Sequence, residues 1–200
     1  MLHYHPVNTS CQDGKIRFLL IARMLWDKGV GEFVEAAKII KIKYPKVIFQ
    51  LLGNCHSDNP SSIGPSIIKN WEKDGVIEYL GMVDDVRPII ASADCVVLPS
   101  YREGIPRTMI ESAAMGKPLI VSDAPGCRDV VIDNVTGFKC KVKDVVSLTK
   151  CCEAIINMRE GDRIDMGVAG RSFIKSHFDQ KLVIDQYLST LKKYGIISNI

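Results

Sequence analysis

Several features of membrane, secreted and nucleic-acid-binding proteins are missing from this sequence of 200 residues. No apolar run approaches the ~18 residues that a membrane-spanning helix needs, and the start lacks the basic and apolar regions of a secretory leader. The seven cysteines form no C-x-x-C pair, which favours reduced thiols over a metal site or a disulfide. The net charge of +3 comes from scattered residues and does not indicate a nucleic-acid binder. We therefore expect a cytoplasmic protein with no nucleic-acid partner.

The usual phosphate-binding fingerprints are also missing. No G-x-G-x-x-G follows the first apolar run, and Gly116-Lys117 is followed by Pro118 rather than belonging to a P-loop. These absences argue against an NAD-dependent dehydrogenase and against a P-loop ATPase. No D-x-D pair is present to hold a divalent metal on a diphosphate. If a diphosphate binds, protein cations and helix dipoles must neutralise it, so we expect no metal and no required cofactor.

The composition is otherwise that of an ordinary globular protein, with 46% hydrophobic and 24% charged residues. A domain of this length buries roughly 70% of its extended-chain surface. The start is an exception, because it is polar, rich in turn residues and without periodicity. We predict that residues 1–15 form a linker or a trimmed inter-domain segment. His3 and His5 could be read as metal ligands, but a frayed tail is the favoured reading.

From residue 16 onward, short apolar runs alternate with amphipathic stretches. The runs predicted as strands are 16–22, 47–52, 76–80, 95–98 and 118–122, with a weaker one at 137–142. The predicted helices are 33–44, 67–73, 86–91, 108–115 and 127–132, followed by 145–158, 163–177 and 180–194. This order predicts an α/β fold, a doubly wound parallel sheet of about six strands with extra C-terminal helices.

The unusual residues follow the predicted strands. Segments rich in glycine, proline and charge come after five of them, at 23–31, 53–54, 81–85, 99–107 and 123–126. Because the carboxyl ends of parallel strands meet at one edge of a sheet, where ligands bind, we expect these segments to line one site. Each loop alone is weak support, since glycine and proline occur in the loops of every α/β protein.

Two predicted helices begin at this edge, one near Gly29 and one near Arg107. Helix N-termini present unpaired N–H groups and about half a positive charge, so they favour phosphate. Arg23 and Lys28, just before the first of them, could add an arginine fork and a mobile ammonium group. The alternative for these two cations is a solvated surface pair.

Glu103 precedes the second helix and Glu111 lies about one turn inside it, so the helix N-terminus lies between them. A glycosidase needs two carboxylates roughly 5–9.5 Å apart around one bond, whereas the space here suits a phosphate group. A carboxylate can accept two hydrogen bonds from a vicinal diol. A nucleotide-sugar has diols at both ends and a diphosphate between them, which matches this order. Two glutamates on a solvated helix face are the alternative.

The stretch LPSYREGIPRTMIESAAMGKP, residues 98–118, resembles the E-x7-E signature region of retaining GT-B glycosyltransferases of family 4. Four other segments agree with that family, namely 22–29, 79–85, 122–131 and 134–138. The resemblance covers roughly residues 16–190. The sequence of residues 101–107 is most similar to that of bacterial enzymes that build capsule, O-antigen or other lipid-linked glycans.

The resemblance implies a role for each matching position. Arg23 and Lys28 would hold the donor diphosphate and, with Glu103 facing the transferred sugar, form the catalytic set. Glu111 would bind the ribose hydroxyls. The remaining donor-binding positions are Gly104, Ile105 and Pro106 beside the sugar, Thr108 and Met109 at the start of the phosphate-facing helix, Val83 and Asp85 near the base, and Gly53 behind the second strand.

The resemblance covers one half of a GT-B enzyme, which has two Rossmann-like domains. We expect a linker at 1–15, a nucleotide-sugar-binding domain at 16–178 and a helix at 179–200 that packs toward an absent N-terminal acceptor domain. The implied function is transfer, with retention, of a sugar from a UDP- or GDP-sugar to a glycan or lipid-linked acceptor. Without its other half the chain should transfer no sugar. Peripheral contact with the inner membrane face is compatible with this function.

Two alternatives belong to other functional classes. The first is a non-catalytic nucleotide-binding module that kept the fold and lost the chemistry. The presence of Arg23, Lys28, Glu103 and Glu111 together argues against it. The second is an epimerase or a phosphorylase of the same architecture, and a phosphorylase would bring a lysine-bound pyridoxal cofactor.

Overall fold

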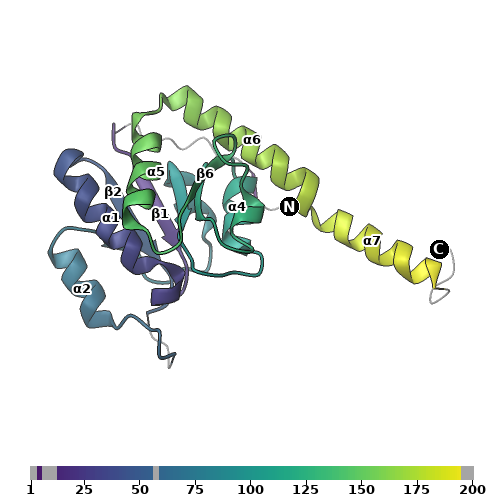
Figure 1. The fold of residues 1–200 in the computed structure, drawn as a ribbon, viewed down its shortest axis with the longest axis horizontal. Helices are drawn as coiled ribbons and strands as arrows, with labels where there is room; N and C mark the ends of the chain where they lie inside the picture. Colours follow the sequence, from purple (N-terminus) through teal and green to yellow (C-terminus); the bar gives the residue numbers. More distant parts are fainter. Residues whose placement is uncertain (1–3, 6–12, 56–58, 195–200) are drawn as a thin grey trace.

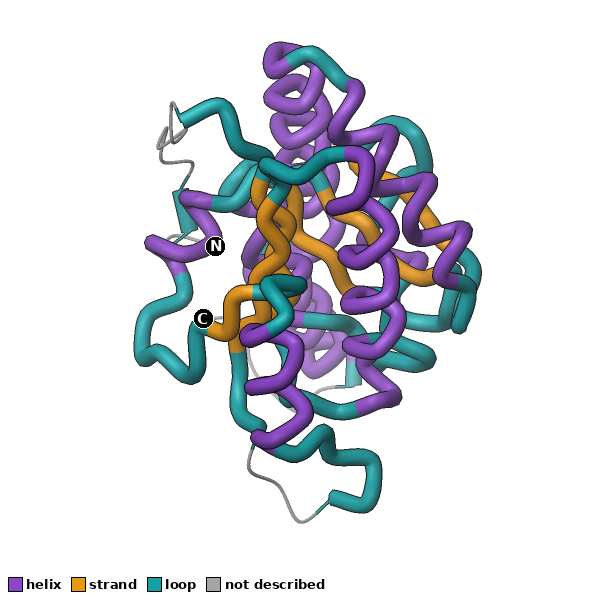
Figure 2. The backbone as a smooth tube through the Cα atoms, turned by 90° about the vertical axis from the view of Figure 1, so that its left-hand side faces the viewer, coloured by secondary structure: helices purple, strands orange, loops and turns teal. Residues whose placement is uncertain are grey.

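The described part of the chain forms a six-stranded sheet with helices on both faces (Figures 1 and 2). The computed structural model describes residues 4–5, 13–55 and 59–194. The strands are β1 (Arg17–Ile21), β2 (Ile48–Leu52), β3 (Glu78–Tyr79), β4 (Cys95–Leu98), β5 (Leu119–Ser122) and β6 (Gly137–Cys140). Their order is β3-β2-β1-β4-β5-β6, and every neighbouring pair is parallel. The predicted doubly wound α/β fold is confirmed.

The strands are apolar because the sheet is covered on both sides. All residues of β4 and β5 are buried, and successive side chains of a strand point to opposite faces. In β1, Phe18 and Leu20 therefore join one core cluster while Leu19 and Ile21 join the other. The core thus lies in two layers, one on each face of the sheet.

The described residues also form seven helices and two short 3-10 turns, of which α5, α6 and α7 follow the last strand. They are η1 (Trp26–Lys28), α1 (Val30–Lys43), α2 (Pro65–Lys73), α3 (Arg87–Ser92), α4 (Arg107–Ala114), η2 (Arg128–Val130), α5 (Val145–Asn157), α6 (Glu160–Phe178) and α7 (Gln180–Lys193). Helices α1 and α5 cover the face that carries Phe18, and α3, α4 and α6 cover the opposite face. Figure 1 shows α1 beside α5, and α4 beneath α6.

Two of the predicted elements differ from the structure. The expected helix at 127–132 is only the 3-10 turn η2, because Val131 is extended and the Thr136 hydroxyl accepts a hydrogen bond from the Ile132 amide at 2.9 Å. β-Branched residues and local side-chain bonds of this kind both oppose a helix. The expected strand at 76–80 pairs only through Glu78 and Tyr79. The amide of Val76 still bonds to Trp71 at the end of α2, so the strand begins later.

The C-terminal part extends away from the body of the domain. Helix α6 runs along the α4 side, and α7 continues past the sheet without covering it (Figure 1). Ile184, Tyr187 and Leu188 are exposed on α7. Within the described residues, no helix combines the length and apolar character needed to cross a membrane. His3, most of the expected linker and residues 195–200 lie outside the described residues.

Candidate functional site

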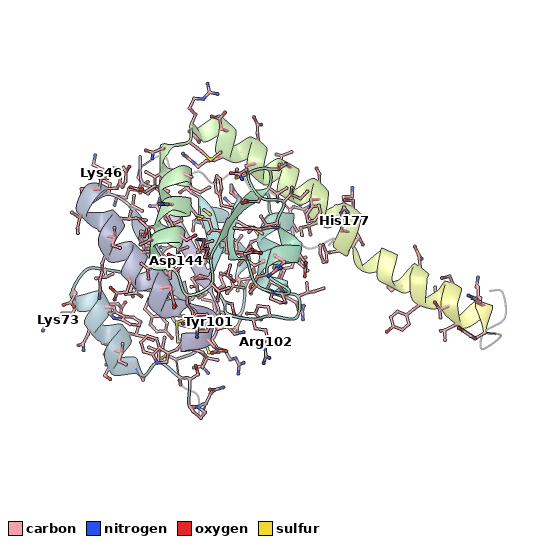
Figure 3. All side chains as sticks on the ribbon, in the orientation of Figure 1. Lys46, Lys73, Tyr101, Arg102, Asp144 and His177 are labelled. Carbon is pink, nitrogen blue, oxygen red and sulfur yellow. The ribbon has the colours of Figure 1, made fainter. Side chains whose placement is uncertain are left out.

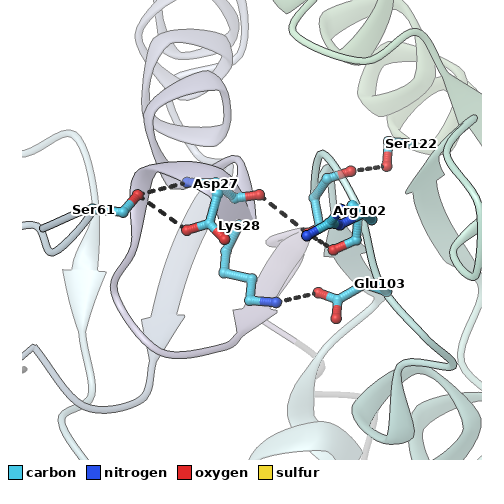
Figure 4. Close-up of polar contacts among 7 residues, drawn as sticks. Asp27, Lys28, Ser61, Arg102, Glu103 and Ser122 are labelled. Atoms are coloured by element: carbon cyan, nitrogen blue, oxygen red, sulfur yellow. Dashed lines mark hydrogen bonds and ion pairs between the residues drawn. The ribbon is translucent and has the colours of Figure 1, made fainter. Parts of the chain in front are cut away.

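Three loops meet at the carboxyl edge of the sheet, after β1, β4 and β5. The main-chain carbonyl of Asp27, after β1, accepts hydrogen bonds from the Tyr101 amide at 2.9 Å and from the Ser100 hydroxyl at 3.1 Å. The hydroxyl of Ser122, at the end of β5, donates to the Ser100 carbonyl (Figure 4). Ser100 and Ser122 are fully buried, so these bonds are shielded from water. The three loops are therefore held to one another by polar contacts that the sequence pattern did not reveal.

Lys28 and Glu103 contact each other across this edge. The Lys28 Nζ lies 2.7 Å from the Glu103 Oε1, and the two side chains are 16% and 17% exposed (Figure 4). Lys28 ends η1, directly before Gly29 and α1, whereas Glu103 lies in the segment between β4 and α4. Two of the residues predicted for the site, 75 positions apart, are thus direct partners.

Close backbone contacts fix the segment that carries Glu103. Gly126, with φ of +80°, lies so near that a Cβ there would be 1.9 Å from the Gly104 carbonyl oxygen and 2.4 Å from that of Glu103. On the other side Gly29, with φ of +73°, lies against the Pro99 carbonyl, which a Cβ would approach to 2.2 Å. Glycine is the residue that permits both the positive φ and the contact distance. The loops after β1 and β5 therefore enclose the β4–α4 segment.

The first turn of α4 lies between the two glutamates, as the sequence predicted. The helix begins at Arg107 after Pro106, and no side chain among the described residues caps its first amide groups. Glu111 lies one turn inside it and is 19% exposed, with the Arg107 Nη2 at 3.7 Å and that side chain 90% exposed. The helix N-terminus thus presents unpaired amides between Glu103 and Glu111, which is an arrangement that favours an anion.

The other residues predicted near α4 differ in exposure. Gly104 and Ile105 are exposed, Thr108 is half-buried and Pro106 is buried. Met109 is buried in the core, and its amide donates to the Pro106 carbonyl at 3.0 Å. The Met109 side chain therefore serves the packing of α4.

Arg23 and Gly53 lie at the ends of the neighbouring strands β1 and β2. A Cβ on Gly53 would be 1.9 Å from the Ala22 carbonyl oxygen, so the two strand ends touch directly before Arg23. The Arg23 side chain is exposed. Among the residues that the structure describes, Arg23 forms no ion pair with Glu103 or Glu111. Its place directly after β1 puts it at the same edge of the sheet as the two glutamates.

Val83 and Asp85 lie in the exposed loop between β3 and α3. Asp85 accepts hydrogen bonds from the Arg87 amide at 3.0 Å and from its guanidinium at 2.8 Å. These bonds lower the pKa of Asp85. The Asp85 carboxylate thus binds the first residue of α3, whereas the Val83 side chain is 40% exposed.

Tyr101 links the β4–α4 segment to two further elements. Its hydroxyl donates to the Glu32 Oε1 at 2.7 Å, and the Lys143 ammonium lies 4.6 Å from the centre of its ring. Burial, and then the Glu32 carboxylate, raise the pKa of Tyr101 to about 12. Tyr101 therefore joins α1 and the β6–α5 loop to the segment that carries Glu103. Sequence reasoning assigned no such role to it.

Comparison with known proteins identifies the family of this chain. The family described as glycosyl transferases group 1 matches residues 15–158, which is most of the chain. The chain belongs to that family. In curated proteins it is 31% identical, over 189 residues, to N,N'-diacetylbacillosaminyl-diphospho-undecaprenol alpha-1,3-N-acetylgalactosaminyltransferase of Campylobacter jejuni. That match covers 94% of this chain and 47% of the relative, so the group 1 chain spans about half the length of the relatives it matches.

Solved structures of GT-B glycosyltransferases share the fold. Anabaena HepE in complex with UDP superposes with a TM-score of 0.79 at 19% identity, covering 90% of this chain and 49% of that one. The C-terminal domain of a group 1 family protein, LpcC of Francisella tularensis, superposes with a TM-score of 0.71 at 19% identity. In that case the match covers 88% of this chain and 96% of the other. The prediction of a GT-B Rossmann-like domain is confirmed.

The described residues contain no group of three His, Cys, Asp or Glu side chains placed to hold a metal ion. Their six cysteines are free thiols. Burial raises the pKa of the Cys95 and Cys152 thiols well above the ordinary value. These two cysteines belong to the apolar core.

Proposed function

We propose that this chain is the donor-binding domain of a retaining glycosyltransferase of family 4, and that it holds a UDP- or GDP-sugar at the carboxyl edge of its sheet. The observation that carries the proposal is the meeting of Lys28 and Glu103 beside the open N-terminus of α4, with Glu111 on the far side of that N-terminus. A diphosphate requires a cation and a helix N-terminus, and the diol on each side of it requires a carboxylate.

In this proposal Arg23, Lys28 and the first amides of α4, near Thr108, bind the diphosphate. As the bond between sugar and phosphate breaks, negative charge grows on the β-phosphate, and these fixed donors stabilise it. Donors of this kind are worth roughly 2.7–4 kcal/mol each in other enzymes. Because Lys28 already has Glu103 as its partner at 2.7 Å, the diphosphate competes with that carboxylate for the ammonium group. The displaced Glu103 is then available to the sugar hydroxyls.

The remaining positions follow from the same placement. Glu111 binds the ribose hydroxyls, because a carboxylate with two acceptor oxygens suits a vicinal diol. Gly104 and Ile105 are exposed beside Glu103, where they can lie against the sugar. The loop with Val83 and Asp85 meets the base, and Gly53 keeps the ends of β1 and β2 together behind it.

The partners of the full protein are part of the proposal. The name of the Campylobacter relative contains a diphospho-undecaprenol acceptor, and HepE was solved with UDP. We therefore infer a nucleotide-sugar donor and a glycan or lipid-linked acceptor, with peripheral membrane contact. An N-terminal domain would carry the acceptor site. The exposed apolar residues of α7, Ile184, Tyr187 and Leu188, would pack toward that domain.

Calorimetry on the chain with UDP and GDP, without added metal, tests this function. We expect weak binding of at least one nucleotide and no transfer of sugar. Arg23→Ala should weaken diphosphate binding, and Glu111→Ala should weaken binding of the nucleoside even without a sugar. Lys46→Ala is the matched control, because Lys46 is an exposed cation that precedes β2 and lies far from Arg102 (Figure 3). Absence of heat with both nucleotides on a folded sample would refute the proposal.

A further inference from the structure

Tyr101 is bonded to the chain on both sides of Lys28. Its amide donates to the main-chain carbonyl of Asp27, the residue before Lys28, at 2.9 Å. Its hydroxyl donates to the Oε1 of Glu32, in the first turn of α1, at 2.7 Å. The short segment that carries Lys28 is therefore attached to Tyr101 before and after the lysine.

The same tyrosine lies two residues before Glu103, the ion-pair partner of Lys28 (Figure 4). The chain between them is also held, because the buried Ser100 hydroxyl donates to the Arg102 carbonyl at 3.2 Å. Tyr101 thus bridges the two segments whose separation determines where the ammonium and the carboxylate lie.

A third loop supports the Tyr101 ring. The ring is half-buried, and the Lys143 ammonium of the β6–α5 loop lies 4.6 Å from its centre. A cation at this distance over an aromatic face is attracted by the ring. The hydroxyl is thereby directed to Glu32 while the ring remains in contact with a separate part of the chain.

We propose that Tyr101 is a positioning residue, which acts through Lys28 and sets the preference for a nucleoside diphosphate over a monophosphate. By holding Asp27 and Glu32, it keeps the lysine ammonium at the edge where α4 begins. This inference rests on the proposed function, in which Lys28 binds the diphosphate at its β-phosphate. A nucleoside monophosphate lacks that phosphate, so Tyr101 should affect affinity for the diphosphate alone.

The variant Tyr101→Phe removes the bond to Glu32 and keeps both the ring and the amide. Calorimetry would compare UDP with UMP, or GDP with GMP if the guanine nucleotide is the one that binds. We expect Tyr101→Phe to weaken binding of the diphosphate about three- to tenfold, as for one lost hydrogen bond, and to leave the monophosphate unchanged. Tyr44→Phe is the matched control, because its hydroxyl bonds to Asn157, at 3.5 Å, at the opposite edge of the sheet.

Variants of Glu32 test the same bond from its acceptor side. Glu32→Gln loses the charge and keeps an oxygen that accepts the hydroxyl, so it should retain the preference for the diphosphate. Glu32→Leu loses the acceptor too, and its preference should fall three- to tenfold below that of Glu32→Gln. In a Tyr101→Phe background the two variants should have the same preference, because the bond is already absent.

The possible outcomes separate the two proposals. If the wild-type chain prefers the diphosphate and Tyr101→Phe keeps that preference in full, Tyr101 has only a structural role and the donor site stands. Equal weakening of both nucleotides leads to the same conclusion. A folded wild-type chain that binds no diphosphate would refute both the donor site and the role of Tyr101. Melting temperatures establish that each variant is folded.

Discussion

The Lys28 ammonium and the Glu103 carboxylate form a largely buried ion pair, with 2.7 Å between Nζ and Oε1. The proposed donor would bind both groups, and in this structure each has the other as its ion-pair partner. A diphosphate therefore competes with Glu103 for Lys28, whereas a sugar attached to that diphosphate can give Glu103 new partners. Glu103 should thus oppose binding of the free nucleotide and favour the sugar-bearing donor.

The variant Glu103→Gln tests this competition. Without the carboxylate charge, Lys28 is free to bind phosphate, and we expect affinity for UDP or GDP to rise about two- to fivefold, the range of a partly screened ion pair. Calorimetry at low salt measures it, and Glu153→Gln, whose carboxylate pairs with Lys43 far from the site, is the control. Weaker binding of the free nucleotide by Glu103→Gln would contradict the competition.

Gly126 should be indispensable for the shape of the site. The variant Gly126→Ala places a Cβ against the carbonyls of Gly104 and Glu103 and forces a non-glycine residue into positive φ. We expect a loss of about 1–3 kcal/mol in the free energy of unfolding, together with weaker nucleotide binding. Urea titration measures the stability. Gly161→Ala in α6, where a Cβ would meet nothing within 4 Å, should lose none. Equal stability of the two variants would show that the loop can move aside.

Ser100 joins the loops after β1 and β4 from a fully buried position. Its hydroxyl bonds to the carbonyls of Asp27 and Arg102, at 3.1 and 3.2 Å. Ser100→Ala should cost about 1–3 kcal/mol of stability, since a buried acceptor loses its donor. The exposed Ser172, which bonds to a carbonyl within α6, is the comparison, and Ser172→Ala should cost under about 0.5 kcal/mol. A Ser100→Ala protein as stable as wild type would show that water replaces the hydroxyl.

Tyr101 should make stability depend on alkaline pH. Its pKa is raised to about 12, from an ordinary value of 10.0, by burial and by Glu32. The folded state therefore holds the phenol proton more tightly than the unfolded state does. The stabilisation is fully present below pH 10 and is lost as the pH rises toward 12. The difference in free energy of unfolding between wild type and Tyr101→Phe should shrink over that window. A difference independent of pH would mean that the phenol is not held by Glu32.

The sheet and most helices were predictable because their signals are local. Short, mostly apolar runs such as 95–98 and 118–122 are typical of strands buried on both faces, and amphipathic stretches such as 145–158 are typical of the helices that cover them. The helix expected at 127–132 was wrong because Thr136, several residues away, supplies the hydrogen bond that keeps Ile132 out of a helix.

The site was predictable only in part. The alternation of strands and helices placed Lys28 and Glu103 at one edge of a parallel sheet, but their contact depends on how closely the loops approach. That approach rests on Gly126, on buried serine hydroxyls and on a tyrosine bonded to α1, none of which has a periodic pattern.

A crystal structure of the chain soaked with UDP or GDP tests the central claim most directly. We expect the β-phosphate to lie at the N-terminus of α4 within hydrogen-bond distance of Lys28, with Glu103 moved off that lysine and Glu111 on the ribose. A nucleotide bound elsewhere, or one bound here with the Lys28–Glu103 pair intact, would contradict the account.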